Sequence, residues 1–353
     1  MSKLLPFLIL PAIALFAAPD QSGKQSSADH PPPRVDLEGA YQLQNANGVT
    51  ISGSFLYWKA YEDGLDFVIK NGGATTINDD GAVERADFNW NCGTRVDFGY
   101  EVPHKRMDLN LCWTWYKTSG RFDDAVTSPN ALFSVWSIPN GAGTQWDYIG
   151  KADTNLQFNS LDLGMSGTFA PRRFLEITPS INLSMLWVHQ KFDFNLSGGP
   201  GIGGHTVVDD QIDMKNNFFG VGPKAGIDTL WNLGYGFGMV GNFNVSILYG
   251  HFHVSQHETV IFRGTAPIVY LDLDKNFYND PRVNFDLMLG VRWDKMLYQG
   301  KYHLLLEAGW ENLIFMGQNQ LMRFNNTAHP ANNSTINGDL ALQGLSLRAL
   351  FAF

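Results

Sequence analysis

Three histidines and one serine alternate over a short stretch of the chain, so that they would share one face of an extended strand. His251, His253 and His257 offer imidazole nitrogens, which are suitable ligands for a transition metal, and Ser255 lies between two of them. No cysteine or closely spaced carboxylate completes a ligand set, because Glu258 falls on the opposite face. The pattern therefore favours solvated histidines, and no metal site is predicted.

The same stretch raises the question of nucleophilic catalysis. Ser255 has a histidine on either side, and several aspartates occur in neighbouring segments. Proximity in sequence does not make a catalytic triad, because the base and the group that orients it must meet in space. The chain also lacks the G-x-S-x-G elbow of hydrolases. The sequence thus predicts no enzymatic activity.

Two further motifs match a site pattern only in part. Residues 199–204 have the G-x-G-x-x-G spacing of a dinucleotide loop, but no helical period follows them. Residues 272–276 begin like a calcium-binding loop, yet Phe277 replaces the required glycine and Val283 replaces the bidentate glutamate. No cofactor is therefore predicted.

Charged residues recur at every second position between apolar ones, which gives the richest candidate chemistry. In 90–100, 107–116 and 283–293 one face is apolar and the other is polar. This period of two defines a strand, and an apolar outside with a polar inside is typical of a membrane barrel. The predicted inner face carries nine acidic and four basic residues: Asp97, Asp108, Asp162, Glu176, Asp228, Asp286, Asp294, Glu307 and Glu311, with Arg95, Lys224, Arg292 and Arg348.

The lengths of the connections predict the topology of this barrel. Short and long connections alternate along the chain, as short periplasmic turns and long extracellular loops do in outer-membrane barrels. Five long loops and four turns predict ten antiparallel strands, with both termini periplasmic. Strand-like pieces at 65–69 and 268–273 would either extend hairpins or raise the count to twelve. The turns are 101–106, 170–173, 234–236 and 296–301, and the loops are 61–89, 117–145, 192–217, 253–282 and 315–340.

Aromatic residues collect at both ends of the predicted strands, as expected for rings at the two membrane interfaces. The last strand, 345–353, also has an apolar face and ends on Phe353, which predicts recognition by the barrel-assembly machinery. The outer girdle comprises Trp90, Trp113, Trp115, Trp187, Tyr249 and Trp310, and the inner girdle Phe98, Tyr100, Trp231, Phe237, Trp293, Tyr302, Phe351 and Phe353.

The N-terminus predicts export. Lys3 precedes an apolar run, so residues 1–18 are typical of a signal peptide cleaved between Ala14 and Ala18. Residues 19–48 form a predicted periplasmic lead-in and 49–353 the barrel. Later segments fall short of the roughly 20 apolar residues of a transmembrane helix, which leaves a closed barrel as the way to span the bacterial outer membrane and contact its lipid.

Net charge and the two cysteines limit the partners. The formal charge of −9 leaves no basic patch for nucleic acid. Cys92 and Cys112 lie on opposite faces of neighbouring predicted strands, which disfavours a disulfide between them. Free thiols, or cross-links between chains through Cys112, are the expected states.

Several phrases resemble the Legionella-type major outer membrane protein family. They are residues 55–66 (FLYWKAYEDGLD), 91–100 (NCGTRVDFGY), 220–228 (GVGPKAGID) and 310–319 (WENLIFMGQN), and the resemblance covers most of 49–353. It implies a pore-forming outer-membrane protein, often abundant and sometimes cross-linked through cysteines. It implies no catalytic residues.

The polar interior and the resemblance together predict a porin for small hydrophilic solutes or ions. Nine acids against four bases favour a wet interior and a weak preference for cations. A surface adhesin or structural coat protein with a plugged barrel is the alternative, and a barrel lipase or protease the third. The sequence leaves open whether copies associate into a homo-oligomer. The pore-lining charges of this prediction are Arg95, Asp97, Asp108, Glu176, Lys224, Asp228, Asp286, Arg292, Glu307 and Arg348.

Overall fold

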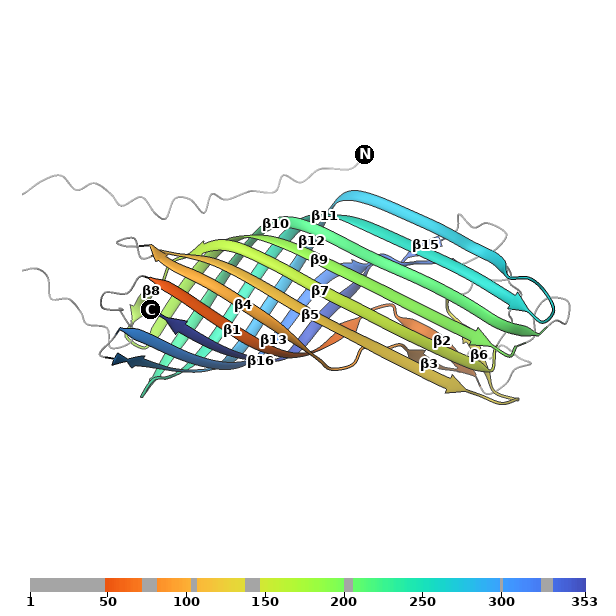
Figure 1. Cartoon of the computed structure of the whole chain (residues 1–353), viewed down its shortest axis with the longest axis horizontal. Helices are drawn as coiled ribbons and strands as arrows, with labels where there is room; N and C mark the ends of the chain where they lie inside the picture. Colours follow the sequence, from red (N-terminus) through yellow and green to blue (C-terminus); the bar gives the residue numbers. More distant parts are fainter. Residues whose placement is uncertain are drawn as a thin grey trace, which may run out of the picture. The chain divides into compact units, whose positions relative to one another are not determined.

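The computed structural model describes residues 48–71, 81–102, 107–136, 147–199, 206–298, 301–324 and 333–353. In these ranges, ten antiparallel strands close into a barrel, because β9 pairs with both β7 and β10 and the first strand pairs with the last (Figure 1). The predicted ten-stranded barrel is therefore confirmed. Its strands are β1 (Val49–Glu62), β4 (Asn91–Val102), β5 (Met107–Ala125), β7 (Ile149–Ser166), β9 (Leu175–Ser197), β10 (Val207–Gly234), β11 (Phe237–Phe262), β12 (Ile268–Leu297), β13 (Tyr302–Asn319) and β16 (Gly338–Ala352).

The register of the pairs sets the width of the barrel. A row of cross-strand neighbours that starts at Leu230 of β10 runs once around the wall and returns to the same strand at Phe218, which is a shear of 12 residues. Eight-stranded barrels are just filled by side chains, whereas 16 strands leave a channel. Ten strands therefore leave an interior that side chains and one inserted segment can fill.

The outer surface of the wall has a broad apolar belt. On β9, Ile181 and Leu183 face outward and are 66% and 45% exposed, and Trp187 ends the belt on that strand. The same pattern holds on the other strands, with the predicted aromatic residues at both margins. Because these side chains would otherwise expose a continuous apolar surface to water, the belt is the part of the barrel that lies in the bilayer.

No helix within the described residues is long and apolar enough to cross a membrane.

Beyond the belt the strands continue, and their apolar face changes from outside to inside. On β9 the outward residues become His189 and Lys191, while Phe192 and Phe194 are buried within the barrel. Several loops are consequently shorter than predicted. In the predicted loop 192–217, β9 continues to Ser197 and β10 already begins at Val207, and residues 268–273 of the predicted loop 253–282 belong to β12. Extended hairpins above the membrane need an apolar interior, and the inverted pattern supplies it.

A small sheet fills the outer mouth of the barrel. It consists of β2 (Asp66–Asn71), β3 (Gly81–Arg85) and β6 (Ala131–Ser134), and we call it the mouth sheet. Phe67 of β2 packs on Phe194 of the wall with ring centroids 4.8 Å apart. The strand predicted at 65–69 thus neither extends a hairpin nor joins the barrel. The shorter strands β8 (Phe169–Arg172), β14 (Met322–Phe324) and β15 (Asn333–Thr335) complete the described elements.

At the inner end of the barrel the predicted turn 234–236 is confirmed, whereas most of the predicted turn 170–173 belongs to β8, and the predicted turns 101–106 and 296–301 include residues outside the described ranges. Residues 234–236 reverse the chain between β10 and β11 with positive φ at all three positions, which two glycines and Tyr235 accommodate. The turn at 103–106 lies outside the described residues, as do residues 1–47, which contain the predicted signal peptide and nearly all of the lead-in.

Candidate functional site

All ten charged residues predicted to line the interior project from inward positions of the barrel strands, in the half that the belt surrounds. The structure brings most of them into ion pairs. Arg95 donates from both terminal nitrogens to the carboxylate of Glu311, at 2.7 and 3.0 Å, and its guanidinium lies 5.6 Å from the ring of Trp58. Arg292 likewise donates to Glu307 at 3.0 and 3.1 Å. These two pairs are nearly enclosed, because both glutamates are less than 10% exposed.

Two of the bases each serve more than one acceptor. The Lys224 ammonium lies 3.0 Å from Asp162 and 3.7 Å from Asp286. Arg348 lies 3.7 Å from Asp97 and donates to the Ser52 hydroxyl at 3.0 Å, and that hydroxyl donates to Asp97 at 2.5 Å.

The structure keeps the unequal numbers of acids and bases, but it places most of the acids beside a basic side chain. Lys224 lies between Asp162 and Asp286, and His303 lies 3.3 Å from Asp294, so six of the nine acids have a basic side chain within 4 Å. Within the described residues, Asp108, Glu176 and Asp228 have no cation within 4 Å, although Asn232 donates to Glu176 at 3.0 Å. These three carboxylates are the acids of the inner half that have no basic neighbour.

An apolar ring separates this charged half from the outer half. It comprises five inward residues of four strands, all less than 10% exposed, and we call it the apolar ring. A cavity of about 40 Å³ lies against it, with Lys224, Asn244 and Asp286 on its polar side. The cavity has room for a water molecule and polar groups to bind it. The members of the ring are Phe158, Leu186, Leu248, Leu313 and Phe315.

Above the ring, buried amides hold a folded-in segment, residues 318–324. Gln256 donates to the carbonyl of Met322 and accepts from its amide, both at 2.9 Å. Asn216 donates to the carbonyl of Gln318 at 2.8 Å and to Gln190 at 2.6 Å. This segment was not predicted from the sequence. The available signal was the inverted pattern of apolar residues, such as Phe252 and Val254 on the inner face of β11.

Glu62 is one of several buried acids of this outer half. Gln190 donates to it at 2.6 Å, and only 3% of the residue is exposed. Burial raises the pKa of Glu62 to about 8, while the hydrogen bond from Gln190 acts in the opposite direction. The neutral acid is therefore the form that the fold prefers.

We expect Glu62→Gln to flatten the dependence of barrel stability on pH. The pKa in the folded protein, about 8, exceeds the ordinary value of 4.5, so the folded state holds the extra proton between these values. Stability should consequently fall as the pH rises from about 4.5 to about 8, and then level off. Urea unfolding in lipid at several pH values measures this, and the substitution Asp87→Asn at an exposed position is the control. An unchanged slope in Glu62→Gln would contradict the assignment.

The histidine–serine stretch lies on the outside of β11, above the belt. His253 contacts Asn276 at 2.7 Å, and His257 contacts Thr259 at 3.0 Å. Ser255 makes no hydrogen bond to either histidine in the described structure. Residues 272–276 are extended in β12 and form no loop, and the described residues contain no cluster of three metal-ligating side chains. Of the glycine-rich segment, residues 200–204 lie outside the described residues.

The two cysteines are free and point to opposite sides of the wall, as predicted. Cys92 is exposed on the outside, whereas Cys112 lies inside the barrel, directly across from Asp97. A cross-link between chains through Cys112 is therefore incompatible with the fold, and Cys92 is the accessible thiol.

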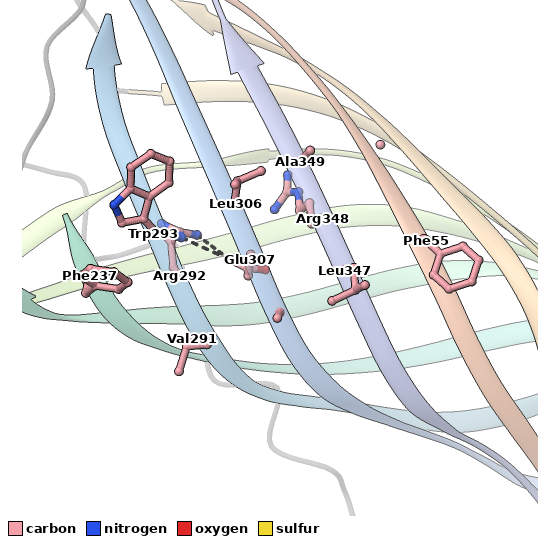
Figure 2. Close-up of a pocket in the computed structure, with 12 residues that line it drawn as sticks. Phe55, Phe237, Val291, Arg292, Trp293, Leu306, Glu307, Leu347, Arg348 and Ala349 are labelled. Atoms are coloured by element: carbon pink, nitrogen blue, oxygen red, sulfur yellow. Dashed lines mark hydrogen bonds and ion pairs between the residues drawn. The ribbon is translucent and has the colours of Figure 1, made fainter.

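A hollow lies on the outside of the belt, between outward side chains of β1, β11, β12, β13 and β16 (Figure 2). It has a volume of about 540 Å³ and is lined by outward residues such as Phe55, Val291 and Leu347. Arg292 and Glu307, joined by dashed lines in Figure 2, belong to the inner face of the same strands. Arg292, Glu307 and Arg348 are among the residues that line the hollow, although their side chains are at inward positions.

Comparisons with known proteins give one match by sequence. The family model described as Legionella pneumophila major outer membrane protein precursor matches residues 43–353. No curated protein matches the chain. Among solved structures, the Pseudomonas putida toluene transporter TodX is 9% identical, with a TM-score of 0.35, over 86% of this chain and 89% of that one. The translocator domain of the Neisseria meningitidis autotransporter NalP is 9% identical, with a TM-score of 0.28, over 88% and 89%. A Pseudomonas aeruginosa FadL homologue is 8% identical, with a TM-score of 0.27, over 86% and 89%.

Proposed function

Because this chain belongs to the family of the Legionella pneumophila major outer membrane protein, a family of the bacterial outer membrane, we propose that it forms a narrow, gated pore for small hydrophilic solutes or ions. The charged inner half of the interior is the observation that carries the proposal. Buried ion pairs are often no more stabilising than apolar packing of the same volume. The outer half of this same barrel is packed with apolar residues, so the charges of the inner half are best explained by contact with water and solutes.

The pore of this proposal is closed in the described conformation. The apolar ring interrupts the polar path, and the mouth sheet and the folded-in segment occupy the space above it. An apolar constriction excludes water and thereby ions until it widens or becomes wet. Opening then requires movement of the ring and of the segments packed above it.

Conductance in planar bilayers tests the proposal. We expect stable single-channel steps, with reversal potentials that indicate a weak preference for cations from Asp108, Glu176 and Asp228. The preference should be strongest at low salt, because the screening length falls from about 30 Å at 0.01 M to about 10 Å at 0.1 M. The double substitution Asp108→Asn and Asp228→Asn should reduce it, whereas Asp213→Asn, on the outside of β10, should not. Preference for anions in the unmodified protein would contradict the assignment.

A surface adhesin or structural coat protein is the second candidate. The filled outer half favours it, because a permanently closed barrel would serve only to display the outer loops. Absence of conductance from well-folded protein, also after the apolar ring is altered, would support this candidate. A lipase or protease is the third, and turnover abolished by Ser255→Ala would favour it.

A further inference from the structure

The outward residues just above the belt form a basic band on six neighbouring strands. On β5, β9, β10 and β11 the belt ends at aromatic residues, and the next two outward positions carry lysine, histidine, serine or asparagine. The corresponding positions carry Gln157 and Asn155 on β7, and Tyr278 and Asn276 on β12. Acidic residues are absent from these described positions. The basic band comprises Lys117, His189, Lys191, Lys215, His251 and His253.

Composition does not explain this absence of acids. The chain carries 34 acidic and 25 lysine or arginine residues, for a net charge of −9. Acids return at the third outward position, where Asp193, Asp213 and Asp274 lie on β9, β10 and β12. The sign of the charge therefore changes with height above the belt, and the positive layer is the one that meets the lipid headgroups.

Two lysines of the band are direct cross-strand neighbours. Lys191 of β9 is opposite Lys215 of β10, an arrangement that destabilises a sheet unless an anion lies between the charges. Asp193 approaches Lys191 at 2.7 Å, but both side chains stay partly exposed. Lys215 has no ion pair within the described residues. Below them on the same two strands, His189 and Asn217 are also opposite each other, 3.3 Å apart.

We propose that the basic band binds the phosphate groups of lipids in the outer leaflet, with Lys191 and Lys215 as its centre. The location of the basic band next to the belt favours a lipid over a free anion as its ligand. Trp187 and Phe219, two positions below His189 and Asn217, mark the interface, so a phosphate held by these residues has acyl chains in reach of the belt. Basic residues near an anionic lipid surface attract it, and the attraction is screened by salt. This binding does not depend on whether the barrel conducts.

Retention of lipid by the purified full chain tests the proposal. The barrel is equilibrated in neutral phosphatidylcholine that contains either a diphosphorylated glycolipid or the same glycolipid without phosphates, and bound lipid is counted by native mass spectrometry. We expect a clear preference for the phosphorylated lipid, which weakens as salt is raised. Lys191→Gln with Lys215→Gln should lower its retention by roughly tenfold, because each lysine at an anionic surface contributes severalfold.

A matched pair of substitutions keeps the result specific. Lys151→Gln with Arg121→Gln removes two exposed outward charges that lie higher on β7 and β5, and this variant should retain the phosphorylated lipid. Both double variants should fold, since exposed substitutions change stability little. Equal retention by the two double variants would overturn the proposal. So would competition by inorganic phosphate at the same concentration as the lipid, because it would show a site for free anions.

Discussion

Conductance of the reconstituted barrel is expected to rise severalfold when Leu248 of the apolar ring is replaced by asparagine. Leu248 is 1% exposed and lines the cavity of about 40 Å³ on the side opposite Lys224 and Asp286. Asparagine is similar in size but brings an amide that binds water, so it should wet the constriction without widening it. Single-channel recording of the variant and of the unmodified protein under the same voltage measures the effect.

Two further variants separate wetting from widening. Phe158 and Phe315, whose rings are 5.3 Å apart, face each other across the ring, and replacing both by alanine should raise conductance by opening space. Phe243→Ala is the matched control, because Phe243 lies on the same strand as Leu248 but faces outward and is 47% exposed. Unchanged conductance in Leu248→Asn and in the double alanine variant would contradict the assignment of the apolar ring as the barrier. The barrier would then lie at the mouth sheet.

Removal of Arg95 alone should be among the most destabilising single changes in the wall. Arg95→Met leaves Glu311, of which only 3% is exposed, without its two hydrogen bonds and its counter-charge. Breaking a buried pair in this way typically costs about 3–5 kcal/mol. Adding Glu311→Leu should recover most of that loss, because no buried charge then remains unpaired. Urea unfolding of the two single variants and the double variant measures the coupling.

The exposed pair Arg121–Asp123 is the matched control for this cycle. Its two side chains are 65% and 47% exposed, and such pairs contribute about 0–1 kcal/mol. Coupling for Arg95 and Glu311 as small as that for the control pair would mean that water enters this part of the interior in the folded protein. That outcome would itself favour an open pore.

Local sequence patterns predicted the wall but not what fills it. The period of two, the alternation of short and long connections and the aromatic margins depend on neighbouring residues, so β4, β5 and β12 and the inward side of all ten charged residues were accessible from sequence. The partners of those charges were not. Arg95 and Glu311 are separated by 216 residues and meet only because the barrel closes.

The errors in the outer half have one physical cause. The sequence was interpreted as if an apolar face always pointed to lipid, and the strands were ended where that face stopped. At Trp187 the outward apolar series of β9 ends, and five residues further on Phe192 is followed by Phe194 on the inward face. This odd spacing moves the apolar residues from the outward to the inward face, which indicates that the strand has passed from lipid into water. The spacing was visible in the sequence.

Because of that change of phase, the same strands are adapted to lipid along one part of their length and to water along the other. Below the aromatic margin the strands have apolar side chains outside and charged ones inside. Above it the polar side chains are outside and the apolar ones inside, as in a water-soluble β-barrel. The hydrophobic effect therefore stabilises the closed outer half. The inner half is stabilised by the surrounding hydrocarbon and by its ion pairs. Extraction from the bilayer therefore destabilises only the half of the barrel inside the belt. We expect the outer half to stay folded longest and to act as the template on which the inner half refolds.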